Sequence, residues 1–327
     1  MTNNPVANSP VINNPVTVKR RRRKIPIAPF VLLAPWFIGM ALFRIYPIIM
    51  TFVYSFSRVN LIFNEREFVG LTNYRNLLTM RWDSEIGRFG GIVWQNQMFR
   101  NSIVATLRYV LIGTPVVLIV AFFVAFILNF KLKGVNLFRT VYYIPSILGG
   151  NVAVSIVWSQ VFGANGPVNA ILSIFGVEPV SWILTTTWAP ITLVFLSAWQ
   201  FGSVMLIFLA ALQNVSPTLY EAASLDGARK LRQLFSITLP IITPVLLFNT
   251  INVLIRHFQE FNAAFIITRR GPNQATDFLN ILIYEFAFVR QHRFGDASAM
   301  TVILLAAIGL LTAILFSSSK YWIHYSD

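Results

Sequence analysis

The chain has 327 residues, of which 56% are hydrophobic and 12% are charged. An ordinary soluble protein has about 25% charged residues, so this composition argues against a soluble domain and for a chain that lies in lipid. The absence of cysteine excludes disulfides, thiolate metal sites and cysteine nucleophiles. The net charge of +14 does not indicate nucleic-acid binding, because six positive residues form one run at 19–24, directly before the first apolar segment.

The N-terminal third divides by composition into a tail, one span and a polar loop. Residues 1–24 have no periodicity and end in the basic run, which predicts a disordered basic tail. Residues 25–56 predict the first transmembrane helix, because the apolar stretch is too long for a signal peptide and lacks a small-residue cleavage site. Residues 57–100 are mixed in character and predict an external loop with short helices around 74–80.

The remaining spans follow within residues 101–320, and residues 321–327 form a short tail. Apolar stretches predict transmembrane helices at 102–130, 140–162, 188–212, 237–267 and 297–316. The span at 237–267 is long enough to require a tilt or a break. The sequence therefore predicts an all-α integral membrane protein with about six transmembrane helices and a cytoplasmic segment at 214–236.

Six spans place both termini on the same side of the membrane, and the basic run indicates that this side is cytoplasmic. In this orientation all six lysines fall on the cytoplasmic side, although several arginines fall in the external loop. These lysines are Lys19, Lys24, Lys131, Lys133, Lys230 and Lys320.

The segment 214–236 carries an ordered pattern of capping, small and charged residues. Ser216 is a good helix N-cap, and Pro217 follows where a first-turn proline is tolerated. Small residues at Ala222 and Ala223 allow another chain to approach closely, and Gly227 can turn the chain between two short helices. On composition alone, a solvated connector between two spans explains the segment equally well.

The order of residues in this segment resembles a known family. The pattern E-A-A-x-x-D-G-A at 221–228, followed by F-x-I-T-L-P at 235–240, resembles the cytoplasmic coupling signature of ABC importer permeases. Further motifs at 68–74, 138–145, 258–261, 270–272 and 284–288 resemble the carbohydrate branch, and within it the maltose-type first permease. Arg270 stands where that branch usually has glycine, and Arg256 and His257 replace residues that are commonly small or neutral.

The resemblance implies a transport subunit of the bacterial cytoplasmic membrane. Its implied partners are a second related permease, two ATPase subunits that bind ATP and Mg, an extracytoplasmic solute-binding protein and a saccharide. The chain itself is then neither an enzyme nor the holder of a cofactor, and it does not bind nucleic acid. The residues implied to dock in a groove of one ATPase are Glu221, Ala222, Ala223, Asp226 and Gly227.

Other classes of function lack support in the sequence. The chain contains no P-loop, so ATP hydrolysis requires a partner. The three histidines match no zinc signature, and no Gly-x-Ser-x-Gly motif is present. Two alternatives stay open: a secondary transporter, which usually has more spans or an internal repeat, and an ABC importer of a non-sugar solute.

Polar and aromatic residues on the predicted spans indicate a substrate path. Buried polar groups are costly in lipid and normally face the bundle interior or a water-filled cavity, and aromatic rings offer an apolar face to a sugar. Helix packing explains any one of these residues equally well. The candidates are Asn151, Trp199, Gln200, Asn252 and Glu260.

The resemblance places Val253, His257 and Glu260 at sugar-contacting positions of the family, with Arg256 next to them. Glu260 lies four residues after Arg256, so an ion pair along one helix face is one expectation. The other is that Arg256 and His257, with Arg269 or Arg270 at the mouth, attract an acidic saccharide such as a uronate oligosaccharide.

Overall fold

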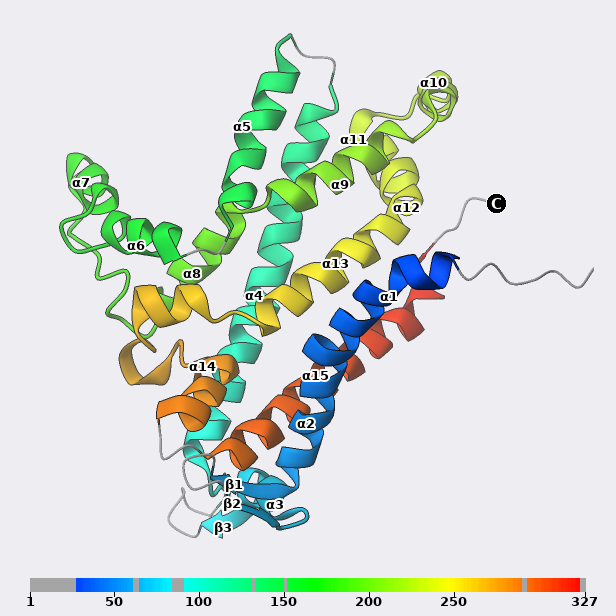
Figure 1. The fold of residues 1–327 in the computed structure, drawn as a ribbon. Helices are drawn as coiled ribbons and strands as arrows, with labels where there is room; N and C mark the ends of the chain where they lie inside the picture. The colour runs from blue at the N-terminus through cyan, green and yellow to red at the C-terminus, as the bar shows by residue number, and fades with distance from the viewer. Residues whose placement is uncertain are drawn as a thin grey trace, which may run out of the picture. The chain divides into compact units, whose positions relative to one another are not determined.

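The computed structural model describes residues 28–60, 65–83, 91–130, 133–149, 152–289 and 293–323. Figure 1 shows the ribbon of the chain. The chain divides into two compact units, residues 1–48 and 49–327. The predicted tail at 1–24 and the predicted path residue Asn151 lie outside the described residues.

The first unit consists of apolar helix. Helix α1 (Ala28–Met40) continues through a π-helical turn, η1 (Ala41–Ile45), into α2 (Tyr46–Ser55), which begins in this unit. Pro47, at the second position of α2, has no N–H to donate to the carbonyl of Phe43, and the wider π-helical turn directly before α2 accommodates the proline. The stretch Phe30–Ser55 is long and apolar enough to cross a membrane.

Three single helices in the described part of the chain satisfy the length and hydropathy of a span, and three bent helix pairs do so together. The single spans are Phe30–Ser55, α4 (Gln97–Leu128) and α15 (Phe294–Ser319). The pairs are α5 (Val135–Leu148) with α6 (Val152–Val161), α8 (Trp188–Trp199) with α9 (Gly202–Gln213), and 230–241 with α13 (Thr243–Phe258). The prediction of an all-α membrane protein with about six spans is confirmed.

The continuous helices predicted at 140–162 and 188–212 are wrong, because both spans are broken. Gly149 ends α5 at a φ of 61°, a conformation that favours glycine. The chain bends by 47° between α8 and α9. The break expected in the long span at 237–267 is confirmed, since the chain bends by 70° at Ile242, between Pro240 and Pro244.

The segment that the sequence predicts to be an external loop contains two antiparallel hairpins as well as the predicted short helix, α3 (Thr72–Leu78). Strand β1 (Ser57–Asn60) pairs with β2 (Glu65–Phe68), and β3 (Met80–Asp83) pairs with β4 (Gly91–Trp94). Asn73, in the motif at 68–74, ties α3 to the end of α2 and the start of β1. Its buried amide donates to the carbonyls of Ser55 and Ser57 at 2.9 and 3.0 Å.

Helix α4 is the central element of the second unit and packs against α8, α9 and α13. Its N-terminus is capped by Asn96, whose side chain accepts from the Phe99 N–H at 3.0 Å. Buried apolar residues of α4, α9 and α13 form one core, among them Val117, Ala121 and Phe208. Gly202 lies where α9 crosses α5, and a Cβ there would meet the Tyr142 carbonyl at 2.6 Å, so the close helix crossing requires the glycine.

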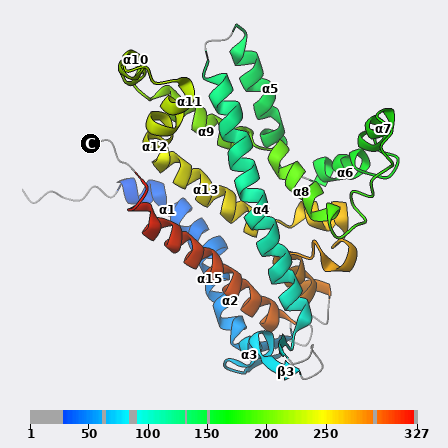
Figure 2. The ribbon, with the colours of Figure 1, turned by 180° about the vertical axis from the view of Figure 1, so that it is seen from behind.

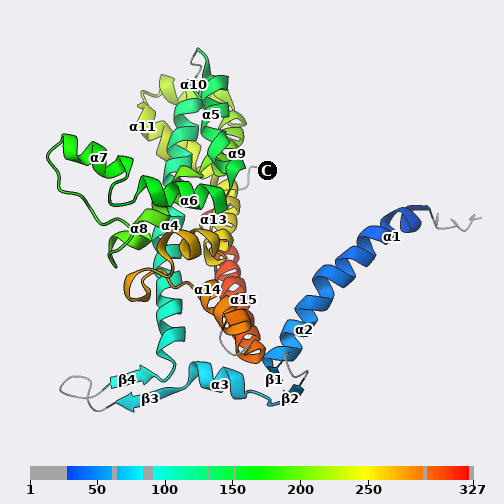
Figure 3. The same cartoon turned by 60° about the vertical axis from the view of Figure 1, so that its left-hand side comes forward.

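Short helices connect and extend the spans of the second unit. Helix α10 lies near the C-terminal end of α4, and the hairpins lie at its N-terminal end (Figures 2 and 3). Helix α10 and the hairpins therefore lie at opposite ends of the second unit. The short elements are α7 (Pro167–Ile174), α10 (Pro217–Leu225), α11 (Lys230–Gln233), η2 (Leu234–Thr238), α12 (Leu239–Ile241), η3 (Ala264–Thr268), η4 (Pro272–Gln274), α14 (Leu279–Tyr284) and η5 (Glu285–Val289).

Candidate functional site

A polar cavity of about 410 Å³ lies between the spans of the second unit. Its wall comes from α4, from the end of α5, from α8, and from the last turn of α13 with the turn that follows. A volume of this size falls within the range of small-molecule sites. Its polar lining includes Tyr109, Ser146, Ser197, Gln200, Arg256, His257, Gln259, Glu260 and Asn262.

His257 joins three helices at this cavity. Its Nδ1 lies 2.9 Å from the Thr114 hydroxyl of α4, and its Nε2 lies 2.6 Å from the Ser197 hydroxyl of α8. The ring also meets the Tyr109 ring edge-on, with centroids 4.9 Å apart. The side chain is buried and both ring nitrogens have protein partners. His257 therefore holds the helices of the cavity wall together and has no free nitrogen to offer a ligand.

The expected ion pair between Arg256 and Glu260 is not formed in the described structure. Helix α13 ends at Phe258, so four residues of spacing do not bring the two side chains onto one helix face. The Glu260 carboxylate instead accepts a hydrogen bond from the backbone N–H of Ala263 at 3.0 Å, which caps the next helical turn. Both side chains line the cavity.

Besides Arg256, His257 and Glu260, the predicted path residue Gln200 also lines the cavity. Its amide donates to the Gly149 carbonyl at 3.1 Å. Trp199 packs on Trp158, with ring centroids 5.5 Å apart, and is not part of the wall. Asn252 is exposed and donates to the Phe248 carbonyl on its own helix, at 2.7 Å.

The predicted sugar contact at Val253 is not supported. This residue is fully buried in the apolar core that α13 shares with α4 and α9, and it is not part of the cavity wall. Tyr109 and Ser197 were not predicted, because a single tyrosine or serine inside an apolar stretch has no distinguishing local pattern. The turn at 259–261 that closes the wall was not predicted either, because the predicted span at 237–267 runs through it.

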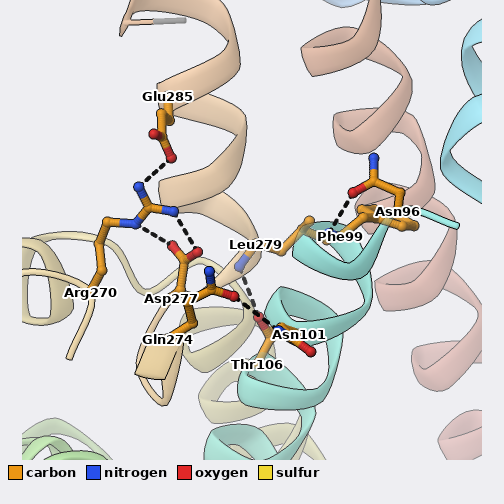
Figure 4. A network of polar contacts seen from close by, with 9 residues as sticks. All are labelled: Asn96, Phe99, Asn101, Thr106, Arg270, Gln274, Asp277, Leu279 and Glu285. Atoms are coloured by element: carbon orange, nitrogen blue, oxygen red, sulfur yellow. Dashed lines mark hydrogen bonds and ion pairs between the residues drawn. The ribbon is translucent and has the colours of Figure 1, made fainter. Parts of the chain in front are cut away.

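The loop after η3 is held by a network of charged and amide groups (Figure 4). The Arg270 guanidinium binds Asp277 through two hydrogen bonds of 3.0 and 2.7 Å and forms an ion pair with Glu285 at 2.5 Å. The hydrogen bonding to Asp277 is the largest cause that raises the pKa of Arg270 above its usual value, and the negative charges of Asp277 and Glu285 add to it. Arg270 is therefore committed to this loop, and the expectation of a free guanidinium at the mouth is wrong for this residue.

The same loop has an unusual backbone. Arg269, Arg270, Asn273 and Gln274 all have positive φ, as does Gly271 between them. The loop is tied to α4, because the Asn101 amide donates to Gln274 Oε1 at 3.0 Å and the Leu279 N–H donates to the Thr106 hydroxyl at 2.9 Å. The φ of 78° at Arg270 is a conformation that glycine adopts without strain, and the side chain of Arg270 forms its ion pairs from this backbone conformation.

The segment 214–236 folds as two short helices joined at a glycine. Helix α10 ends in a Schellman motif, in which Ala228 N–H donates to the Ala223 carbonyl at 2.8 Å and Gly227 N–H donates to the Ser224 carbonyl at 3.1 Å. Gly227 has a φ of 78°, so the predicted turn at this glycine is confirmed. Ser216 occupies the N-cap position, but its hydroxyl bonds Thr218 instead of the backbone.

Helix α10 presents a largely exposed surface while its base is anchored. Glu221, Ala222 and Asp226 are exposed, and Leu225 is 90% exposed. Beneath them the Tyr220 hydroxyl bonds the Thr238 hydroxyl at 2.9 Å, and the buried Gln233 amide donates to Ser224 Oγ at 2.9 Å. A helix that is fixed at its base holds its exposed residues in one arrangement, which lowers the entropy cost of binding another protein.

Apolar spans around a polar cavity, with a fixed, exposed helix at one end, define a membrane permease. A family model, binding-protein-dependent transport system inner membrane component, matches residues 87–324. The chain therefore belongs to this family of inner-membrane transport permeases. This membership does not favour a secondary transporter.

Related proteins and structures agree with this assignment. The chain is 38% identical to the probable ABC transporter permease protein YesP of Bacillus subtilis, over 94% of this chain and 95% of that protein. It is 30% identical to the arabinooligosaccharides transport system permease protein AraP of Halalkalibacterium halodurans, over 88% and 85% of the two chains. A bacterial alginate ABC transporter, crystallised with a periplasmic protein that holds an alginate pentasaccharide, matches with a TM-score of 0.73 over 90% and 94%. At 18% identity, this last similarity shows the fold alone.

Proposed function

We propose that the chain is the membrane-spanning permease subunit of an ATP-driven saccharide importer. The observation that carries this proposal is the anchored, exposed helix α10, which presents the E-A-A-x-x-D-G pattern at the end of the unit opposite the external hairpins. The family membership supplies the class of transporter, and the names of relatives such as AraP support a saccharide as substrate.

The coupling surface consists of Glu221, Ala222, Ala223, Asp226 and Gly227. In this proposal α10 inserts into a groove of an ATPase subunit, and the closing of two ATPase subunits on ATP moves α10 as a rigid body. The contacts of Tyr220 with Thr238 and of Gln233 with Ser224 transmit this movement to η2 and α13. Because α13 carries Arg256 and His257 into the cavity wall, the cavity is connected to the coupling helix through α13, α12 and η2.

The chain supplies neither the ATPase nor a cofactor in this proposal. Two partner ATPase subunits bind ATP and Mg, a second related permease completes the pathway, and an extracytoplasmic binding protein delivers the saccharide. Both termini and α10 lie on the cytoplasmic side. The external hairpins and α3 then face the binding protein.

Reconstitution tests the proposal. The chain is assembled in proteoliposomes with its partner permease, ATPase subunits and binding protein, and uptake of a panel of labelled oligosaccharides is measured with and without ATP. The proposal predicts ATP-dependent uptake, and Glu221→Lys should abolish uptake while ATP hydrolysis continues. Saccharide uptake by the chain alone, driven by a proton gradient, would contradict the proposal.

A further inference from the structure

The cavity wall contains a cation whose partner is missing from the described part of the chain. Of the four positive or titratable side chains that could attract an acidic substrate, His257 is bonded at both nitrogens and Arg270 is bound to Asp277 and Glu285. Arg269 lies directly after η3 and is not part of the wall. This leaves Arg256.

Arg256 lines the cavity from the last turn of α13. Its guanidinium makes no hydrogen bond or ion pair with any residue that the structure describes, although the Glu260 carboxylate lines the same cavity. The C-terminal end of α13 favours a cation by its dipole. An ionisable group inside a membrane span nevertheless needs a counter-charge or water.

We propose that Arg256 binds a carboxylate of the transported saccharide, so that the cavity selects acidic oligosaccharides such as oligouronates. This inference rests on the proposed function and adds the substrate class. The planar guanidinium fork can bind both oxygens of a carboxylate. Glu260 and Gln200 can bind the hydroxyl groups of the same sugar. The Glu260 carboxylate accepts hydrogen bonds from hydroxyls, and the Gln200 amide can accept or donate them.

The rival partner for Arg256 is an acidic side chain of the second permease subunit. The position of Arg256 in a cavity wall, beside hydroxyl, amide and aromatic groups, favours a small polyhydroxylated ligand over a subunit contact. The two possibilities predict different behaviour of an Arg256 variant: a ligand contact affects one class of substrate, whereas a subunit contact affects assembly and every substrate.

The test uses the reconstituted complex with its binding protein. The probes are trimers of galacturonate, glucuronate and mannuronate, each paired with the same trimer in which every carboxylate has been reduced to a primary alcohol. ATP-dependent uptake of each pair is compared for the native complex, Arg256→Gln and Arg256→Lys. Arg269→Gln is the control, because it removes an arginine that is close in sequence but not part of the cavity wall, and it leaves the ion pairs of Arg270 in place.

The expected result is that the native complex takes up at least one acidic trimer. Arg256→Gln should reduce that uptake by about 10- to 100-fold, the range for a lost charge-assisted hydrogen bond, and Arg256→Lys should be intermediate. Arg269→Gln should leave the acidic-to-neutral ratio unchanged. Native uptake of neutral trimers alone, or equal losses of both classes in Arg256→Gln, overturns the inference and leaves the proposed function intact. No uptake from either series by an assembled complex that takes up another saccharide overturns the inference alone, whereas no uptake of any saccharide counts against the proposed function as well.

Discussion

The hydroxyl groups of Tyr220 and Thr238 lie 2.9 Å apart, so that α10 is tied to the π-helical turn through which the chain continues toward α13. Tyr220→Phe removes this hydrogen bond, which is worth about 1 kcal/mol, and leaves the ring in place. We expect the ratio of saccharide taken up to ATP hydrolysed to fall several-fold while the complex stays assembled. Tyr321→Phe, the same change at an exposed tyrosine near the C-terminus, should have no effect.

Gly227 provides a second test of the coupling surface. A Cβ at this position would meet no atom within 4 Å, so Gly227→Ala disturbs only the backbone conformation. A left-handed residue other than glycine costs about 1–2 kcal/mol, and asparagine tolerates this conformation better than alanine. Gly227→Ala should therefore reduce coupled uptake more than Gly227→Asn.

The control for Gly227 is Gly176, which also has a positive φ, 73°, and where an added Cβ would likewise meet no atom within 4 Å. It lies after α7 and outside the coupling segment. Gly176→Ala should show the same loss of thermal stability without loss of coupling. If both alanine variants lower the uptake per ATP equally, then α10 has no special part in coupling.

The order and type of the spans could be predicted from the sequence because long apolar stretches leave few alternatives in a membrane. The breaks at Gly149 and at residues 200–201 could not, since hydropathy averages over a window and does not detect a local turn. The hairpins before α4 were missed for a different reason. Their strands are only four residues long, and the side chains of β2 are all exposed, so no alternating pattern marks them.

The site was only partly predictable for a related reason. Arg256, His257 and Glu260 could be identified because ionisable residues in an apolar span are conspicuous. Their partners could not be assigned, since the end of α13 at Phe258 separates Arg256 from Glu260 and leaves the latter to cap the next turn. The partners of His257 on α4 and α8 are 143 and 60 residues away in sequence.

Arg270 should contribute to stability more than an arginine on the surface. Arg270→Gln removes the guanidinium that binds the fully buried Asp277 through two hydrogen bonds. Breaking a buried pair costs about 3–5 kcal/mol, and we expect a loss near the lower end because the Arg270 side chain is 28% exposed. Arg58→Gln is the control, since the Arg58–Glu67 pair is exposed and should contribute less than about 1 kcal/mol. Thermal unfolding of the detergent-solubilised protein measures both.

The backbone at Arg270 makes a further comparison possible. Glycine accepts a φ of 78° without strain, whereas alanine does not. Although both substitutions remove the ion pairs, Arg270→Gly should be more stable than Arg270→Ala by about 1–2 kcal/mol. Equal unfolding temperatures for the two variants would show that the backbone of this loop relaxes when the guanidinium is removed.

Gly113 tests whether the placement of His257 matters for transport. A Cβ at Gly113 would lie 3.1 Å from His257 Cε1, and the imidazole has little room to move because Thr114, Ser197 and Tyr109 surround it. Gly113→Ala should therefore shift the ring, weaken its two hydrogen bonds and reduce ATP-dependent uptake by about 10-fold, the equivalent of one net hydrogen bond. Gly309→Ala on α15 is the matched control, since a Cβ there meets nothing within 4 Å and alanine favours the helix by about 0.5–1 kcal/mol. Normal uptake by Gly113→Ala, with the complex assembled, would show that the cavity does not depend on the position of the imidazole.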